Sequence, residues 1–307
     1  MKYQLSHTTT FRYSDPVPLG HNEAHLTPRS FWRQECLISR LDIVPNPATV
    51  QRWTDYFGNQ VTFFTVEEEH RELSVKAVSQ VEVFAPYTPA AEDTPPWEKV
   101  QAAFDAPADA DTLAASQFTF DSPYVRRNRD LADYAKVSFT PGRPLLAATM
   151  DLTGRIFREF KFDPTATCVN TPTSEVFQKK RGVCQDFAHL QVGCLRSLGL
   201  AARYVSGYLL TDPPPGKPRM IGADASHAWL SVFCPGTGWL DFDPTNNQMP
   251  SLRHVTLGWG RDYGDICPIN GLFLGGGKHV MTVAVDVVPY PDDGGKASDH
   301  APLNAGR

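Results

Sequence analysis

The first position in this sequence that could support chemistry is a cysteine at the predicted start of a helix. Apolar residues follow Cys184 at spacings of three and four, a pattern typical of a helix with one buried face. Gly199 ends the pattern where a helix C-terminus favours glycine. A thiol in the first turn would lie at the positive end of the helix dipole, which favours the thiolate. Taken alone, Cys184 is equally well interpreted as a small residue of the core.

A predicted hairpin further along the chain supplies an imidazole and a carboxylate. Residues 226–233 and 239–243 alternate as strands, and the Pro and Gly residues between them predict a turn. If the strands pair about the centre of that turn, His227 and Asp243 lie on one face as opposite or diagonal neighbours. A histidine can take the proton of a thiol, and a carboxylate can orient the histidine. The hairpin therefore offers Cys184 a base and an orienting acid, although each residue alone could be an ordinary strand residue.

The segments that carry these three residues resemble the transglutaminase-like superfamily of cysteine acyl-transferases and peptidases. They are GVCQDFAHL around Cys184, RSLGLAARYVSGYL after it, SHAWLSVF around His227 and GWLDFDPTNN around Asp243. The resemblance implies that Cys184 is the nucleophile, His227 its base and Asp243 the orienting residue. It extends to both ends of the chain, where YQLSHTTTFRYSDPV and GRDYGDICPINGLFLGGGKHVMTVAVDV resemble the bacterial branch of the superfamily.

Aromatic and acidic residues near these segments are candidates for contacting a substrate. The resemblance places the loop 258–265 beside the catalytic cysteine, so Tyr263 and Asp262 are candidate substrate-binding residues. Trp229 shares a predicted strand face with His227 and could line a tunnel for a substrate chain. Strand tryptophans more commonly pack a hairpin against its neighbours, and this alternative stays open for Trp229.

The overall composition is that of an ordinary globular protein. Of its 307 residues, 41% are hydrophobic and 21% charged, and the formal net charge is −5. This balance gives no reason to expect nucleic acid or an anionic membrane as a partner. No apolar run approaches the roughly 20 residues that span a bilayer. Because the N-terminus also lacks the apolar core of a signal peptide, we expect a cytoplasmic protein.

Potential metal ligands do not form a recognisable pattern. The six cysteines show neither paired spacing nor a CxxC motif, which argues against a disulfide framework and against a zinc site. His7, His21 and His25 are interpreted as scattered surface residues in preference to a metal cluster. The sequence has no calcium loop of the Asp-x-Asp type. We therefore expect no metal, no cofactor and a reducing compartment, which would suit a reactive thiol.

The predicted fold class is α+β, with two domains. Residues 1–86 contain short alternating strands separated by turn residues, which predicts an N-terminal antiparallel β-sandwich. Residues 97–288 are expected to form the catalytic domain, transglutaminase-like and papain-like, in which helices pack on an antiparallel sheet. Within it, residues 279–288 are predicted to be a buried strand that closes the sheet. Residues 289–307, rich in Asp, Gly, Ala and Pro, are predicted to be a tail.

The predicted activity is acyl transfer through a thioester on Cys184. Transfer of the acyl group to water would make the protein a peptidase or amidase that acts on a peptide, a protein or a small amide. Transfer to an amine would make it a transglutaminase, which is the first alternative. The second alternative is a catalytically silent binding or scaffold protein. Hydrolysis is preferred because water is always present and no amine-binding pocket is evident in the sequence.

Overall fold

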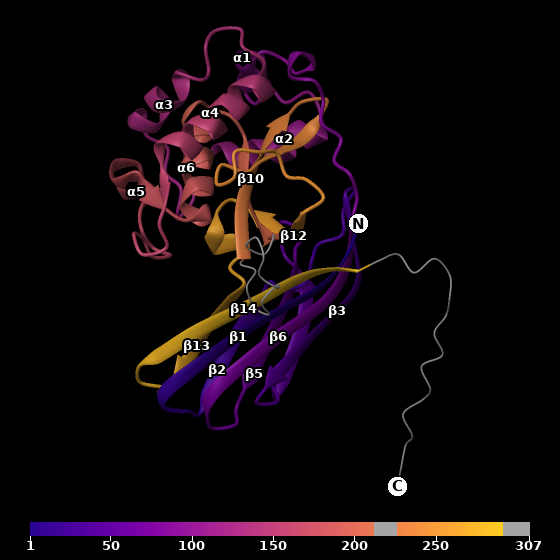
Figure 1. Cartoon of the computed structure of the whole chain (residues 1–307), viewed down its shortest axis with the longest axis vertical. Helices are drawn as coiled ribbons and strands as arrows, with labels where there is room; N and C mark the ends of the chain where they lie inside the picture. Colours follow the sequence, from indigo (N-terminus) through magenta and orange to yellow (C-terminus); the bar gives the residue numbers. More distant parts are fainter. Residues whose placement is uncertain (212–225, 291–307) are drawn as a thin grey trace, which may run out of the picture.

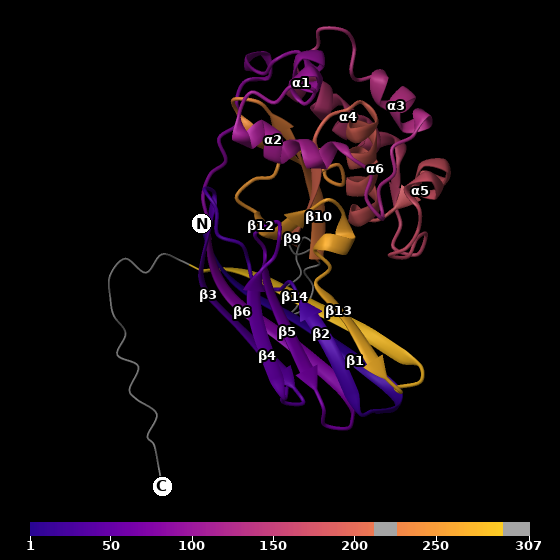
Figure 2. The same ribbon diagram turned by 180° about the vertical axis from the view of Figure 1, so that it is seen from behind.

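The computed structural model describes residues 1–211 and 226–290. A β-sandwich lies next to a part in which helices cover a third four-stranded sheet (Figure 1). The view from behind shows the same two parts, with the helices gathered at the end away from the sandwich (Figure 2). The sandwich and the helix-covered antiparallel sheet confirm the predicted α+β fold class.

Two antiparallel sheets of four strands form the sandwich. Their strands are β1 (Lys2–Val17), β2 (Leu19–Ala24), β3 (Gln34–Val44), β4 (Thr49–Thr54), β5 (Gln60–Val66), β6 (His70–Val83), β13 (Ile269–Leu274) and β14 (His279–Tyr290). One sheet has the order β14-β1-β6-β3 and the other β13-β2-β5-β4. Buried residues alternate with less buried ones along β1 and β6, because successive side chains of a strand point to opposite faces.

The two last strands of the described chain belong to the sandwich. β14 pairs with β1 from end to end, and β13 pairs with β2. The prediction that residues 279–288 form a buried strand closing the catalytic sheet is therefore wrong. β14 is an edge strand, and residues 279–284 are exposed. Its alternating apolar residues are equally compatible with a central strand and an edge strand, so the pattern does not identify the sheet that it joins.

A third antiparallel sheet carries the candidate site. In spatial order it consists of β11 (Gly238–Phe242), β10 (Ser226–Cys234), β9 (Ala202–Leu209) and β12 (His254–Gly260). The helices are α1 (Trp97–Ala103), α2 (Ala110–Ser116), α3 (Arg129–Lys136), α4 (Leu145–Glu159), α5 (Thr173–Lys179) and α6 (Cys184–Ser197), with short 3₁₀ turns η1 (Ala91–Asp93), η2 (Gln117–Thr119) and η3 (Tyr263–Asp265). Helix α6 packs against β10, and the core that they share includes Leu230, Val232 and Leu240. Ser231 of β10 and Asp241 of β11, which alternate with these core residues, therefore face away from α6.

Side-chain amides from the sandwich region bind the free edge of β12. The Gln34 amide donates to Thr256 O and accepts from Thr256 N, each at 2.7 Å. Asn59 does the same with Trp259, at 2.8 and 3.0 Å. A Cβ at Gly258 would lie 2.4 Å from Asn59 Oδ1, so this approach requires glycine. The amides satisfy backbone groups that an edge strand leaves unpaired, and they fix β12 to the rest of the molecule.

The histidines of the sandwich have separate partners. His7 Nδ1 lies 2.8 Å from the Tyr208 hydroxyl, and His25 Nδ1 lies 3.0 Å from the Cys267 carbonyl oxygen. Because both histidines are buried, their interpretation as surface residues is wrong, whereas His21 is exposed.

None of the helices in the described part of the chain is long and apolar enough to cross a membrane. Positions 289 and 290 of the predicted tail are the end of β14, and positions 291–307 lie outside the described residues.

Candidate active site

Cys184 is the first residue of α6, as the sequence predicts. Two short parallel strands, β7 (Lys161–Phe162) and β8 (Arg181–Gly182), lead the chain to this point. The Asp186 carboxylate accepts hydrogen bonds from the Val183 backbone N–H at 2.8 Å and from the Thr167 hydroxyl at 2.6 Å. A Cβ at Gly182 would lie 2.6 Å from Asp186 Oδ2, so this contact requires glycine. These contacts fix the helix start and with it the half-buried thiol.

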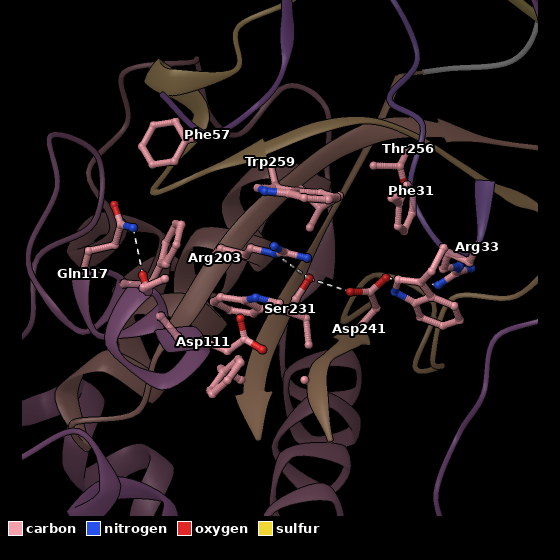
Figure 3. A pocket seen from close by; sticks show the side chains of 18 of the residues that line it. Phe31, Arg33, Phe57, Asp111, Gln117, Arg203, Ser231, Asp241, Thr256 and Trp259 are labelled. Atoms are coloured by element: carbon pink, nitrogen blue, oxygen red, sulfur yellow. Dashed lines mark hydrogen bonds and ion pairs between the residues drawn. The ribbon is translucent and has the colours of Figure 1, made fainter. Parts of the chain in front are cut away.

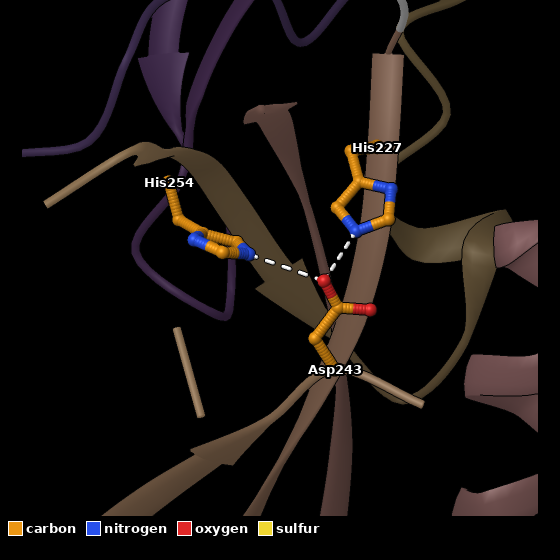
Figure 4. Close-up of side chains that lie close together, drawn as sticks. All are labelled: His227, Asp243 and His254. Carbon is orange, nitrogen blue, oxygen red and sulfur yellow. Dashed lines mark hydrogen bonds and ion pairs between the residues drawn. The ribbon is translucent and has the colours of Figure 1, made fainter. Parts of the chain in front are cut away.

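His227 and Asp243 meet at the end of the β10–β11 hairpin (Figure 4). His227 Nε2 lies 2.8 Å from Asp243 Oδ2. The strand register places Ser231 opposite Asp241, which makes Trp229 the position opposite Asp243 and His227 its diagonal neighbour. This geometry agrees with the diagonal form of the predicted pairing.

Asp243 is fully buried and accepts hydrogen bonds on both oxygens. Oδ2 lies 2.8 Å from His227 Nε2, 3.2 Å from His254 Nε2 and 2.7 Å from Asn246 Nδ2. Oδ1 accepts from the backbone N–H of Thr245 at 3.0 Å. Burial alone would raise the pKa of Asp243, but the hydrogen bonds from His227 and His254 and the imidazolium charge hold it well below its ordinary value. The carboxylate therefore remains ionised.

His227 is held between a carboxylate and a thiol. Burial by itself would lower the pKa of His227, because it disfavours the charged form. Hydrogen bonds to Asp243 and to Cys184, together with the negative charges of both groups, outweigh burial and raise this pKa to about 10. Since Nε2 faces Asp243, Nδ1 is the ring nitrogen that is available to Cys184. An imidazolium placed in this way can stabilise a thiolate and later donate a proton.

A second histidine, which sequence reasoning missed, also binds Asp243 (Figure 4). His254 is 1% exposed, and its Nδ1 accepts a hydrogen bond from the Ser251 backbone N–H at 3.2 Å. Nδ1 therefore carries no proton, and Nε2–H donates to Asp243. Burial lowers the pKa of His254 in spite of the carboxylate, so the ring is neutral. A lone histidine in an apolar strand segment gives no sequence signal that would have identified this role.

His227, Asp243 and His254 also form the one group of three potential metal ligands within the described ranges. In the tautomer fixed by Ser251, however, His254 Nε2 carries its proton and is a donor, not a ligand. The distances of 2.8 and 3.2 Å to Asp243 Oδ2 are those of hydrogen bonds. The group is therefore a hydrogen-bonded network in which both histidines bind the Asp243 carboxylate.

The three predicted substrate-contacting residues differ in how far the rest of the protein buries them. Tyr263 is half-buried and packs on the same apolar cluster as Cys184. Asp262 is fully buried, and its carboxylate accepts from the Tyr124 backbone N–H at 2.8 Å. Trp229 is also fully buried, with its ring centroid 5.3 Å from that of His254. Asp262 and Trp229 are therefore covered by the rest of the protein, and for Trp229 this agrees with the packing alternative that the sequence leaves open.

Two family sequence models match the chain. The bacterial transglutaminase-like N-terminal region matches residues 3–82, and the transglutaminase-like superfamily matches residues 134–244. The second match contains Cys184, His227 and Asp243.

Similar proteins occur in several bacteria. An uncharacterized protein of Mycobacterium tuberculosis is 42% identical over 303 residues, which cover 95% of this chain and 94% of that protein. A protein-glutamine gamma-glutamyltransferase of Pseudomonas aeruginosa is 29% identical over 125 residues, or 40% of this chain and 19% of that protein. The crystal structure of a proposed cysteine protease from Cytophaga hutchinsonii has the same fold, with a TM-score of 0.73 and 18% identity, and the match covers 95% of this chain and 92% of that one. This chain therefore belongs to the transglutaminase-like superfamily and carries the N-terminal region of its bacterial members.

Proposed function

We propose that this protein is a cysteine-dependent acyl-transfer enzyme that cleaves amide or peptide bonds through a thioester. The observation that carries the proposal is the contact of 2.8 Å between His227 Nε2 and Asp243 Oδ2, and it is supported by the interaction with Cys184 that helps to raise the pKa of His227. A thiol, an imidazole and a carboxylate in series are the groups by which a weak nucleophile is activated. The roles assigned are nucleophile for Cys184, base and acid for His227, and orienting residue for Asp243.

The first half of the reaction forms the acyl-enzyme. With its pKa raised to about 10, His227 holds a proton at neutral pH, and an imidazolium in this position would stabilise the thiolate form of Cys184, which is the nucleophile. The sulfur attacks the carbonyl carbon of the substrate and an oxyanion forms. As the first residue of α6, Cys184 has a backbone N–H without a partner inside the helix, and this N–H can donate to the oxyanion. The carbon–nitrogen bond then breaks, and His227 gives its proton to the leaving amine.

The second half regenerates the thiolate. Neutral His227 takes a proton from water, and the resulting hydroxide equivalent attacks the thioester carbonyl. The carbon–sulfur bond breaks, the acid product leaves, and His227 is again an imidazolium. Asp243 stabilises that charge in both halves through its bond to Nε2.

The acceptor of the acyl group defines two candidate activities. We propose hydrolysis of a peptide, protein or small amide as the main reaction. Transfer to an amine is the second candidate, and the similarity to the gamma-glutamyltransferase of Pseudomonas aeruginosa favours it. We also propose a reducing, cytoplasmic location, because all six cysteines are unpaired and disulfides are rare in such a compartment.

The acyl-transfer test supplies a library of short peptides and glutamine amides in the presence of a primary amine at millimolar concentration. Mass spectrometry then separates acid from amide products. We expect acid as the main product, with Cys184→Ala inactive. Mostly amide product would make the protein a transglutaminase, and no product of either kind would favour the silent scaffold.

A second test identifies the reactive thiol by iodoacetamide labelling. Cys168 is exposed, and hydrogen bonds, first of all from Thr171, lower its pKa, so it would compete for the reagent. Labelling is therefore followed in the Cys168→Ala protein. We expect modification of Cys184 with parallel loss of activity, while Cys194, buried on the same helix, stays unlabelled. Inactivation that tracks Cys194 labelling would overturn the assignment.

The matched control is Cys194→Ala. It should keep the activity and lower the melting temperature, because it leaves a small cavity in the core.

A further inference from the structure

A cavity of about 700 Å³ lies on the face of the third sheet that is turned away from α6 (Figure 3). Ser231 and Asp241 line it, and they alternate along their strands with residues buried under α6. Phe31 and Phe57 line it from the sandwich region, and α2 contributes Ala114. The cavity thus has the size of an ordinary small-molecule site, at a junction of two parts of the molecule where such sites are common.

A buried cation lines this cavity. Arg203 on β9 is 8% exposed, and its guanidinium lies between Trp239 and Trp259, 4.1 and 3.8 Å from the ring centroids. Its Nε donates to Ser231 Oγ at 3.3 Å, a contact that Figure 3 shows. Within residues 1–211 and 226–290, no carboxylate lies within 4.0 Å of this guanidinium. Its terminal N–H groups therefore have no charged partner among the residues that the structure describes.

Two other charged residues of the lining, Arg33 and Asp241, bind each other. Arg33 Nη1 lies 3.1 Å from Asp241 Oδ2, and Asp241 Oδ1 accepts from the Ser231 hydroxyl at 2.5 Å. Arg29 stacks on the far face of Trp259, 3.7 Å from its centroid, and donates to backbone and side-chain oxygens nearby. Burial lowers the pKa of Arg203 to about 9, which still leaves it charged at neutral pH. Indole faces offset only part of the cost of burying such a charge.

The chemistry of the lining selects a class of ligand. A guanidinium matches a carboxylate with two parallel hydrogen bonds. Asp241, and Asp111 at the exposed rim, would repel a phosphate dianion more strongly than a monoanion. The aromatic walls suit an apolar body. We propose that this cavity binds a carboxylate carried on an aromatic or aliphatic body, and that Arg203 is its anion-binding residue.

The cavity is separate from the candidate active site. Trp229 occupies the position between His227 and Ser231 on the same strand face, and it is fully buried. Ser231 lines the cavity, whereas His227 does not. The proposal therefore stands independently of the acyl-transfer activity. It leaves two sources for the ligand, a free small acid and the C-terminal residue of a peptide, which share the carboxylate and the apolar body.

Calorimetric titration of the whole protein tests the proposal. The probes are 3-phenylpropanoate for a free acid, N-acetylphenylalanine for a peptide terminus, and the primary amides of both as neutral controls. We expect saturable binding of at least one acid and binding of its amide weaker by at least about tenfold. Tighter binding of N-acetylphenylalanine would identify a peptide terminus, and tighter binding of 3-phenylpropanoate a free acid. The titrations are repeated in Cys184→Ala, in which affinity should not change.

Two variants locate the binding. Arg203→Gln removes the cation and should weaken acid binding by at least about tenfold. Ala114→Trp, at an exposed position of α2, should fill the cavity mouth without touching Arg203, while Ala102→Trp on α1, also exposed, is the matched control outside the lining. If Arg203→Gln does not fold, the two tryptophan variants decide. Equal affinity for acid and amide, full binding by Arg203→Gln or Ala114→Trp, or no saturation by any probe would overturn the proposal.

Discussion

Asp241 and Asp243 are two residues apart and lie on the same face of the hairpin, but their carboxylates bind different side chains. Asp243 accepts hydrogen bonds from two histidines, His227 at 2.8 Å and His254 at 3.2 Å. Asp241 forms an ion pair with Arg33 at 3.1 Å and accepts from Ser231, whose oxygen also binds Arg203. The same side-chain type on one strand edge thus belongs to two separate networks.

The two networks differ in whether the side chain that binds the carboxylate can release a proton. A histidine side chain can gain and lose a proton near neutral pH, whereas an arginine side chain remains charged. The Asp243 network can therefore move a proton to and from Cys184, and the Asp241 network can only hold fixed charge. Fixed charge suits binding of an anion, and a mobile proton suits acyl transfer. The two proposed functions would thus depend on carboxylates that are two residues apart in the sequence and belong to separate networks.

The largest expected effect comes from the Asp243 network. Asp243→Asn leaves the shape of the side chain but removes the charge that stabilises the His227 imidazolium. We expect kcat/KM to fall by roughly three to four orders of magnitude, as loss of an orienting carboxylate does in other triads. The measurement is steady-state turnover of the best amide substrate found in the acyl-transfer test. Retention of more than a tenth of the activity would show that Asp243 does not orient His227.

Titration of buried histidines gives the next largest effect, on stability. Burial lowers the pKa of His7 from 6.5 to about 4. Between these values the unfolded chain binds a proton that the folded protein does not, so stability falls as pH drops below 6.5 and levels off below about 4. Between pH 7.5 and 4.5 this histidine should cost roughly 2–3 kcal/mol of unfolding free energy.

Urea unfolding at both pH values measures this cost, with His7→Gln as the variant that cannot titrate. His189, whose pKa burial lowers to about 3, acts in the same direction and remains in both proteins. His227 has the opposite sign, because its raised pKa gives stability that is complete below 6.5 and lost as pH rises through about 10. An equal pH response in wild type and His7→Gln would contradict the assignment of a neutral His7.

His254 should have a smaller effect on turnover and should act through Asp243. Loss of its hydrogen bond in His254→Leu should lower kcat/KM by about tenfold, the usual value for a bond to a charged group. Without this donor the Asp243 carboxylate becomes more basic and interacts more strongly with His227, so the pKa of His227 and the alkaline limb of the pH–rate profile should move to higher pH. His254→Gln can still donate through its amide and should recover part of the rate. A rate loss with an unchanged pH profile would mean that His254 only packs the core.

The sequence predicts the elements that contain the site well, because their signals are local. Apolar spacing and a closing glycine define α6, and alternation with a turn defines the β10–β11 hairpin. The position of the hairpin residues on one face follows from the two-residue period of a strand. Placement of β14 could not be predicted in the same way, since pairing with β1 joins residues nearly the whole chain apart.

The residues that support the site were missed for the same reason. His254 reaches Asp243 only because β12 lies beside β9, and Arg203 meets Trp259 through the same pairing. The local sequence around a histidine or an arginine in a strand does not indicate which residue it will contact. Trp229 is a candidate substrate contact in the sequence because it shares a strand face with His227. A shared strand face does not show whether other parts of the protein bury the residue, and Trp229 is fully buried.

Asp241→Asn should have the smallest effect on turnover and so tests the separation of the two networks. Arg33 and Ser231 bind different oxygens of Asp241, so the new side-chain amide would keep an acceptor for one of them and lose the charge, at a cost of about 1–2 kcal/mol in stability. Turnover should stay within about threefold of wild type, because residues in separate networks act nearly independently. Acid binding at Arg203 should become tighter, since a neighbouring negative charge is removed. A rate loss close to that of Asp243→Asn would instead show that both carboxylates serve one proton-transfer network.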